Sequence, residues 1–142
     1  MTNTATATKA FRVLGTTDHE TTCWLCGRDE LRGTIALEIL DVDGTGTGNV
    51  VYYGSSCGAK AAGWTQKEFN TAVKVADQAK RDAHRIAMEE ESNRYCAARD
   101  AWCQTTYGCD IWSVRDANGK RRQSYGIVLE FDAAVAAGTA VI

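Results

Sequence analysis

The chain has 142 residues and a net charge of −2, which fits one domain or one small domain with an appendage. The slight negative charge argues against tight general binding to nucleic acid, which needs a basic surface, but it leaves room for a local basic patch. No stretch approaches the roughly 20 apolar residues that cross a membrane.

The start of the chain, residues 1–9, is rich in threonine and alanine. It has neither the basic start nor the apolar core of a secretory signal, and we interpret it as a disordered lead-in. We therefore expect a cytoplasmic protein. Stable disulfides are rare in that reducing compartment, so the six cysteines are expected to be metal ligands, core residues or reactive thiols.

Strand patterns dominate the N-terminal part of the chain. Residues 10–15 alternate in side-chain direction, and residues 34–40 place three aliphatic side chains on one face. A turn rich in Gly and Asp at 41–49 then leads to the apolar run at 50–53. These patterns predict a strand followed by a β-hairpin. Residues 54–63 are typical of a tight turn that opens a short helix.

A helical segment is predicted over residues 64–108. Thr65 and Glu68 fit a capping box, and small apolar residues follow at helical spacing. A single helix of this length would extend about 60 Å, which exceeds what a small domain can cover. We therefore expect an interruption near residues 91–93 or a helical hairpin. Packing against a second copy, as a homodimer through this segment, is the alternative.

The C-terminal residues 109–142 contain two apolar runs on either side of residues 116–119, Asp-Ala-Asn-Gly. This turn sequence predicts a second β-hairpin, followed by a tail. Basic and aromatic residues interleave near its tip, a combination that suits nucleic-acid binding. A solvated turn with its aromatic residues in the core is the competing interpretation. The candidate contacts with nucleic acid or a protein partner are Arg115, Lys120, Arg121 and Arg122.

Three cysteines flank the first predicted hairpin in a C-x2-C-x30-C pattern, with Cys23 and Cys26 before it and Cys57 after it. A C-x-x-C turn presents two thiolates together, and the glycine that follows relieves the tight backbone. A third thiolate at the start of a helix is favoured by the positive end of the helix dipole. The order of knuckle, hairpin and helix start is that of zinc-ribbon and treble-clef modules. We therefore predict a structural Zn2+ site.

The fourth ligand of this site is left open by the sequence. His19, four residues before Cys23, is the candidate we include with the three cysteines. Asp18, a distant cysteine or water are the alternatives. The distant cysteines are Cys96, Cys103 and Cys109. Cys96 and Cys103, seven apart on one helix face, are expected to pack as small apolar residues.

Two other chemistries are compatible with these residues. Cys23 and Cys26 could form a redox pair, although thioredoxin-like pairs stand at a helix N-terminus within a βαβ pattern, which is missing here. Cys57 could act as a nucleophile if His19 or His84 served as its base.

The N-terminal region resembles a group of uncharacterised small zinc-ribbon-like, treble-clef-like proteins encoded by actinobacteria and their phages. The resemblance covers roughly residues 10–63 and implies a metal-binding module in a bacterial host, with no particular activity. In that group the positions of Asp18 and His19 are often both acidic, which keeps Asp18 a candidate ligand. The matching positions are Phe11 to Gly15, Asp18, Thr22-Cys23, Cys26-Gly27-Arg28, Leu31, Thr34, Leu37-Glu38, Tyr53-Gly54, Cys57 and Ala59.

The sequence thus predicts an α+β protein with a zinc-bearing β-hairpin module at residues 10–63. A long or broken helical segment at 64–108 and a C-terminal β-hairpin with a tail at 109–142 complete it. The predicted function is that of a non-enzymatic adaptor, stabilised by zinc, which binds protein or nucleic acid as a phage or prophage accessory protein. The alternative is a thiol- or metal-dependent enzyme that uses Cys57 or an open zinc position.

Overall fold

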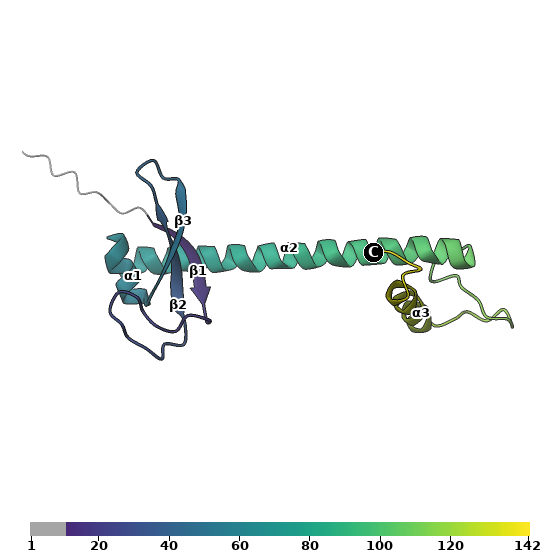
Figure 1. Cartoon of the computed structure of the whole chain (residues 1–142). Helices are drawn as coiled ribbons and strands as arrows, with labels where there is room; N and C mark the ends of the chain where they lie inside the picture. The colour runs from purple at the N-terminus through teal and green to yellow at the C-terminus, as the bar shows by residue number, and fades with distance from the viewer. Residues whose placement is uncertain (1–10) are drawn as a thin grey trace, which may run out of the picture. The chain divides into compact units, whose positions relative to one another are not determined.

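The computed structural model describes residues 11–142, which fold into two compact units. The first unit ends at Ala83, the second comprises His84–Ile142, and one helix contributes to both. No helix in the described residues is long and apolar enough to span a membrane. In chain order (Figure 1) the elements are β1 (Phe11–Thr17), β2 (Thr34–Leu40), β3 (Gly46–Tyr53), α1 (Ser55–Ala62), α2 (Gln66–Tyr107) and α3 (Ser124–Ala136).

The first unit is built on an antiparallel sheet with the strand order β1-β2-β3. The predicted strand at 34–40 and the hairpin that follows it are confirmed. The return strand begins earlier than expected, at Gly46, because Gly46 still pairs with Leu40 and the Thr47 hydroxyl donates to the Ile39 carbonyl at 2.7 Å. These contacts are made mainly by the backbone and leave no apolar pattern in the sequence.

Helix α2 covers the outer edge of β1 within the first unit. The pairing of β1 with β2 shifts between Val13 and Gly15, where φ is +110°. Beyond this bulge the Asp77 carboxylate accepts hydrogen bonds from the Thr16 N–H at 2.7 Å and from the Thr16 hydroxyl. Lys80 donates to the Thr16 carbonyl at 3.1 Å. The backbone N–H and carbonyl of Thr16, on this edge strand, thereby gain partners.

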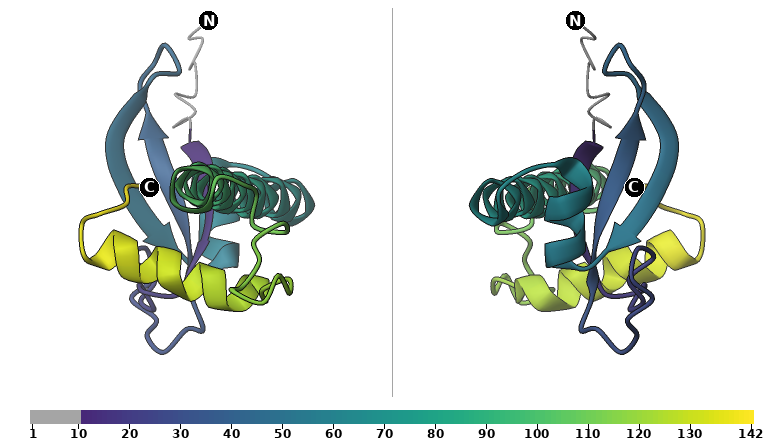
Figure 2. Two further views of the ribbon diagram at one scale, coloured as in Figure 1. Left: turned by 90° about the vertical axis from the view of Figure 1, so that its right-hand side faces the viewer. Right: turned by 90° about the vertical axis from the view of Figure 1, so that its left-hand side faces the viewer.

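The core of the first unit lies where the sheet meets the two helices. Leu37 of β2 and Phe69 of α2 are fully buried, and α1 contacts β2 and β3 (Figure 2). Gly58 of α1 lies against the Phe69 ring so closely that a Cβ at Gly58 would overlap it. The absence of a side chain at Gly58 therefore sets how near α1 comes to α2.

The capping box at the start of α2 is confirmed. The Glu68 carboxylate accepts from the Thr65 N–H at 2.9 Å, and the Glu68 N–H donates to the Thr65 hydroxyl at 3.2 Å. These two bonds satisfy backbone donors that a helix start leaves without intrahelical partners.

The expected break in the helical segment is wrong. Helix α2 runs without interruption from Gln66 to Tyr107, so there is neither a helical hairpin nor a stop at residues 91–93. The chain contains no proline, and Ser92 and Asn93 have only modestly lower helix propensity than their neighbours. α2 also supplies buried side chains to both cores, Phe69 to the first and Cys103 to the second.

The predicted second β-hairpin is also wrong. The turn forms, since the Asp116 N–H donates to the Lys120 carbonyl at 2.8 Å and an isolated bridge joins Arg115 to Arg121. The second apolar run is helix α3, however, with Ile127 and Phe131 buried on one face. These two positions are four apart, which suits a helix, and the alanine-rich continuation favours the helix over a strand.

The second unit has its own core between the C-terminal part of α2, residues 111–114 and α3. Cys103, Ile111, Val114 and Ile127 are buried there. The Phe131 ring lies 5.7 Å from the Trp102 ring and 5.2 Å from the Tyr95 ring, centroid to centroid. Aromatic pairs at these separations add to the stability gained from burial alone.

We expect Gly58→Ala to destabilise the first unit, because the new methyl group must displace the buried Phe69 ring. Overpacking of this kind costs about 1–3 kcal/mol. Gly126→Ala in α3 is the matched control: its nearest neighbour is an Arg122 nitrogen at 3.8 Å, and the substitution should stabilise by about 0.4–1 kcal/mol. Urea denaturation of both variants measures the difference, and equal midpoints would contradict the close approach.

Candidate metal centre

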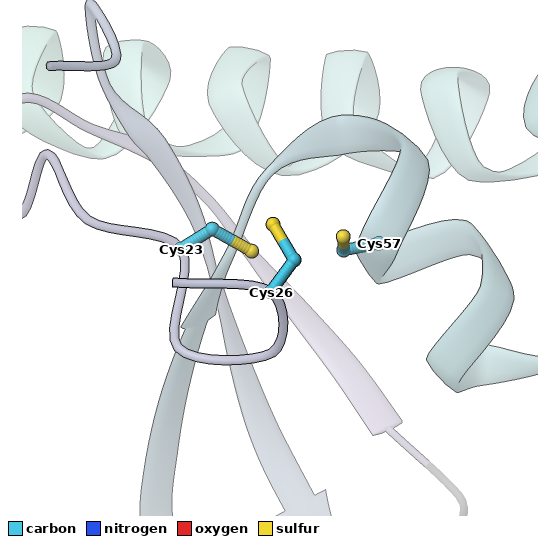
Figure 3. A group of neighbouring side chains, drawn as sticks. All are labelled: Cys23, Cys26 and Cys57. Carbon is cyan, nitrogen blue, oxygen red and sulfur yellow. The ribbon is translucent and has the colours of Figure 1, made fainter. Parts of the chain in front are cut away.

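Three cysteines distant in sequence converge in the first unit. Cys23 and Cys26 lie in the loop between β1 and β2, and Cys57 is the third residue of α1. Their sulfur atoms all lie within 4.8 Å of one another, and Figure 3 shows Cys57 on its helix facing the other two. We call Cys23, Cys26 and Cys57 the three-cysteine group. Its geometry could hold a metal ion, as the sequence predicted.

The loop around Cys23 and Cys26 is a tight backbone turn. The Gly27 N–H donates to the Cys23 carbonyl at 2.8 Å, and the Cys23 N–H donates to the Arg28 carbonyl at 2.9 Å. Gly27 has φ +72°, a conformation that glycine adopts without steric cost. The glycine after the C-x-x-C pair therefore has the role that the sequence predicted for it.

The Cys23 sulfur is prepared to carry negative charge. The side chain is buried, at 1% exposure. Burial by itself would raise the pKa of the thiol, but backbone N–H groups of Gly54, Cys26 and Leu25 donate to the sulfur and lower its pKa to about 7. The Gly54 N–H lies 3.2 Å from the sulfur. Hydrogen bonds to the charged form of a group favour that form.

The Cys57 thiol shows the opposite shift. Its hydrogen bonds with the Cys26 and Cys23 sulfurs, together with the negative charge that these would carry, raise the pKa of Cys57 to about 11. Without a cation the three sulfurs therefore resist being ionised together. A divalent metal among them would reverse this repulsion, because metal coordination deprotonates a thiol. Three sulfur donors from a tight turn and a helix start suit a soft or borderline metal.

The structure does not bring His19 to the three-cysteine group. Its Nδ1 lies 2.5 Å from the Thr17 hydroxyl, and its ring meets the Tyr52 ring edge-on at 6.2 Å between centroids. Asp18 lines a separate hollow of about 530 Å³. Among residues 11–142, no fourth His, Cys, Asp or Glu joins the group.

The other cysteines have no part in this centre. All six cysteines are free thiols. Cys103 is fully buried in the core of the second unit, as predicted for a small apolar side chain. Cys109 packs against the same core. Cys96 is half-buried on α2.

The four basic candidate contacts of the second unit are engaged to different degrees. Arg115 donates to the Gly119 carbonyl at 2.9 Å, and the Arg121 guanidinium lies over the exposed Trp112 ring at 5.7 Å. Arg122 pairs with Glu130 of α3 and approaches the Tyr107 ring. Arg122 therefore has a structural role within its unit. Lys120 is exposed at the turn.

Arg28 and Gly54 were not predicted as site residues; the sequence marked them only as positions of the resemblance. Both line a hollow of about 160 Å³ beside the three-cysteine group. The sequence does contain a pattern that points to Gly54. Residues 54–57 are Gly-Ser-Ser-Cys, which is the C-x-x-C spacing with glycine in place of the first cysteine. Comparisons with protein-family models, curated proteins and solved structures give no match for this chain. The chemistry of the site therefore rests on its own geometry.

We expect the Arg122–Glu130 pair to make the second unit less stable in acid. The hydrogen bonds from Arg122 and then Tyr107 lower the pKa of Glu130 from 4.5. A lowered pKa contributes stability that is present above 4.5 and is lost as the pH falls through the lowered value. The Glu130 side chain is 45% exposed, so solvent screening keeps the effect below about 1 kcal/mol.

The measurement is urea denaturation of wild type and Glu130→Gln between neutral pH and about pH 3. The stability difference should be largest at neutral pH and vanish in acid. Arg122→Gln should give the same pattern, and the double variant should lose little more than either single variant. A difference that does not change with pH would refute the pairing.

Proposed function

We propose that this chain is a zinc-stabilised adaptor that binds another macromolecule and is not an enzyme. In this proposal Cys23, Cys26 and Cys57 hold a Zn2+ ion that maintains the fold of the first unit. The observation that carries the proposal is the convergence of the three sulfur atoms within 4.8 Å of one another. Zinc is the metal that cysteine-rich structural sites hold most often in a reducing compartment.

The structural role follows from what the metal would connect. The loop at residues 18–33 has no helix or strand, and most of its side chains are exposed. Its links to the sheet include the bond from the Trp24 N–H to the Tyr52 carbonyl at 2.9 Å and the edge-on contact of these two rings. A metal would add a link between this loop and the first turn of α1. Such binding energy contributes directly to folding.

The macromolecule bound is a protein or a nucleic acid. In the second unit, Lys120 and the Arg121–Trp112 pair combine positive charge with an exposed aromatic ring, which suits phosphate contact and base stacking. Near the metal centre, Trp24 and Leu25 are each more than half exposed, which suits contact with a protein. The resemblance to proteins of actinobacteria and their phages supports a phage or prophage accessory role in the bacterial cytoplasm.

One observation favours a second candidate, a thiol- or metal-dependent enzyme. The hollow of about 160 Å³ beside the three-cysteine group would give a small molecule access to the metal or to Cys57. Catalytic zinc sites keep one coordination position open, whereas structural sites use four protein ligands. The two candidates differ in what the metal does for stability, and that difference can be measured.

Zinc-loaded protein should contain one Zn2+ per chain by native mass spectrometry, and removal by a chelator should unfold the first unit. At a free zinc concentration 1,000-fold above Kd, the metal would stabilise the fold by about 4 kcal/mol. Cys57→Ser should lower zinc occupancy and stability together, because one of the three sulfur ligands is lost. Thermal denaturation with and without chelator measures both effects.

Cys96→Ser is the matched control, since it removes a half-buried thiol that lies outside the three-cysteine group. It should keep both the zinc and the response to chelator. A Cys57→Ser protein that remains as stable as zinc-loaded wild type would overturn the structural role. Absence of metal from wild type, with six reactive thiols, would return attention to Cys23 and Cys26 as a redox pair.

A further inference from the structure

Gly54 stands where the first turn of α1 meets the three-cysteine group. It is the N-cap of α1 with φ −64° and ψ 158°, a conformation open to any residue. A Cβ at Gly54 would lie 3.9 Å from the Cys23 sulfur and 3.7 Å from a Leu31 methyl carbon, both ordinary contacts. A side chain at position 54 would therefore reach the candidate metal centre without strain. Glycine has no side chain, so it supplies no ligand.

The space beside Gly54 is large enough for a small ligand. The hollow of about 160 Å³ is lined by the three-cysteine group together with Arg28, Leu31 and residues 54–56. A water molecule occupies about 30 Å³ in the liquid, so the hollow, which would also contain the metal ion, has room for a ligand of a few non-hydrogen atoms.

The polar groups around this space favour an anion. A divalent metal with three thiolates would carry a net charge of −1. Arg28, an exposed residue, is among those that line the same hollow, and its side chain makes no hydrogen bond or ion pair within residues 11–142. No side chain caps the N-terminus of α1, so backbone N–H groups of its first turn are available to an acceptor. A guanidinium beside helix N–H groups recognises a carboxylate well.

We infer that Gly54 leaves the fourth coordination position open, and that the position takes an exchangeable small thiol that carries an acidic group. Its thiolate is the donor to the metal, because sulfur matches the three ligands already present. Its carboxylate or similar acidic group meets Arg28 and the start of α1. The inference rests on the proposed metal site, and it names the ligand class that this site accepts.

The test uses full-length protein loaded with Co2+, whose absorption reports the number of thiolate ligands. Titration with mercaptoacetate should increase the thiolate-to-cobalt charge-transfer absorption as a fourth sulfur binds. 2-Mercaptoethanol, which has no acidic group, should bind about tenfold more weakly, in line with the loss of one charge-assisted hydrogen bond. Arg28→Gln should remove this preference for mercaptoacetate over 2-mercaptoethanol.

Gly54→Cys tests the open position directly. The variant should show four-thiolate absorption without added thiol, hold zinc more tightly against a chelator, and give no response to mercaptoacetate. Gly54→Ala adds the Cβ without a sulfur atom, so it should keep the three-thiolate absorption. This control separates the effect of the added thiolate from the effect of the added volume.

The outcomes separate the two proposals. Failure of wild type to bind Co2+ or Zn2+ would refute the metal site itself. Bound Co2+ whose spectrum neither thiol changes would leave the metal site standing and overturn the open position, even if Gly54→Cys did not fold. Equal affinity for both thiols in wild type would overturn the role of Arg28 and with it the acidic ligand class.

Discussion

The hydrogen bond from the Gly54 N–H to the Cys23 sulfur is the contact on which the geometry of the candidate metal centre depends. It joins the loop between β1 and β2 to the junction of β3 and α1, and its distance is 3.2 Å. The bond fixes the buried thiol in position and favours its ionised form. Since Gly54 is also the N-cap of α1, the same residue orients the turn that carries Cys57. The hairpin β2–β3 forms the rigid connection between these two parts.

The position of Cys57 depends in turn on the packing of α1. Gly58, the next residue, lies against the buried Phe69 ring, so the approach of α1 to α2 is set by a contact one residue from the ligand. The start of α2 is held by its capping box, and further along the helix Asp77 and Lys80 bind the backbone of Thr16. The sheet, α1 and the first part of α2 therefore hold the sulfur ligands as one packed body. Proteins hold metal ligands with packed neighbours of this kind, because a ligand on a loose element loses affinity.

Local sequence patterns predicted the parts of this centre that depend on local physics. The strand at 34–40 was readable from alternation, the capping box from Thr65 and Glu68, and the tight turn from Cys23, Cys26 and the glycine after them. The closeness of Cys57 to Cys23 and Cys26 could be predicted because these cysteines stand on either side of a β-hairpin. Helix α3 was not readable, because a short apolar run such as residues 127–131 fits a strand and a helix equally well until tertiary contacts decide.

The fourth ligand could not be read from the sequence, because that question concerns the direction of side chains and not their spacing. His19 is close to Cys23 along the chain, yet its imidazole bonds to Thr17 and lies edge-on to the Tyr52 ring. Gly54 is distant along the chain and adjacent in space, and it has no side chain to suggest a role. Metal ligands are recognised in a sequence by side-chain donor atoms, and Gly54 has no side chain. With a metal bound, the proposed site of three thiols, a glycine and a nearby arginine would combine a structural metal's sulfur donors with the open position of a binding site. In that proposal stability and ligand exchange would reside in one centre, because the three protein sulfurs would hold the loop while the fourth position exchanged its ligand.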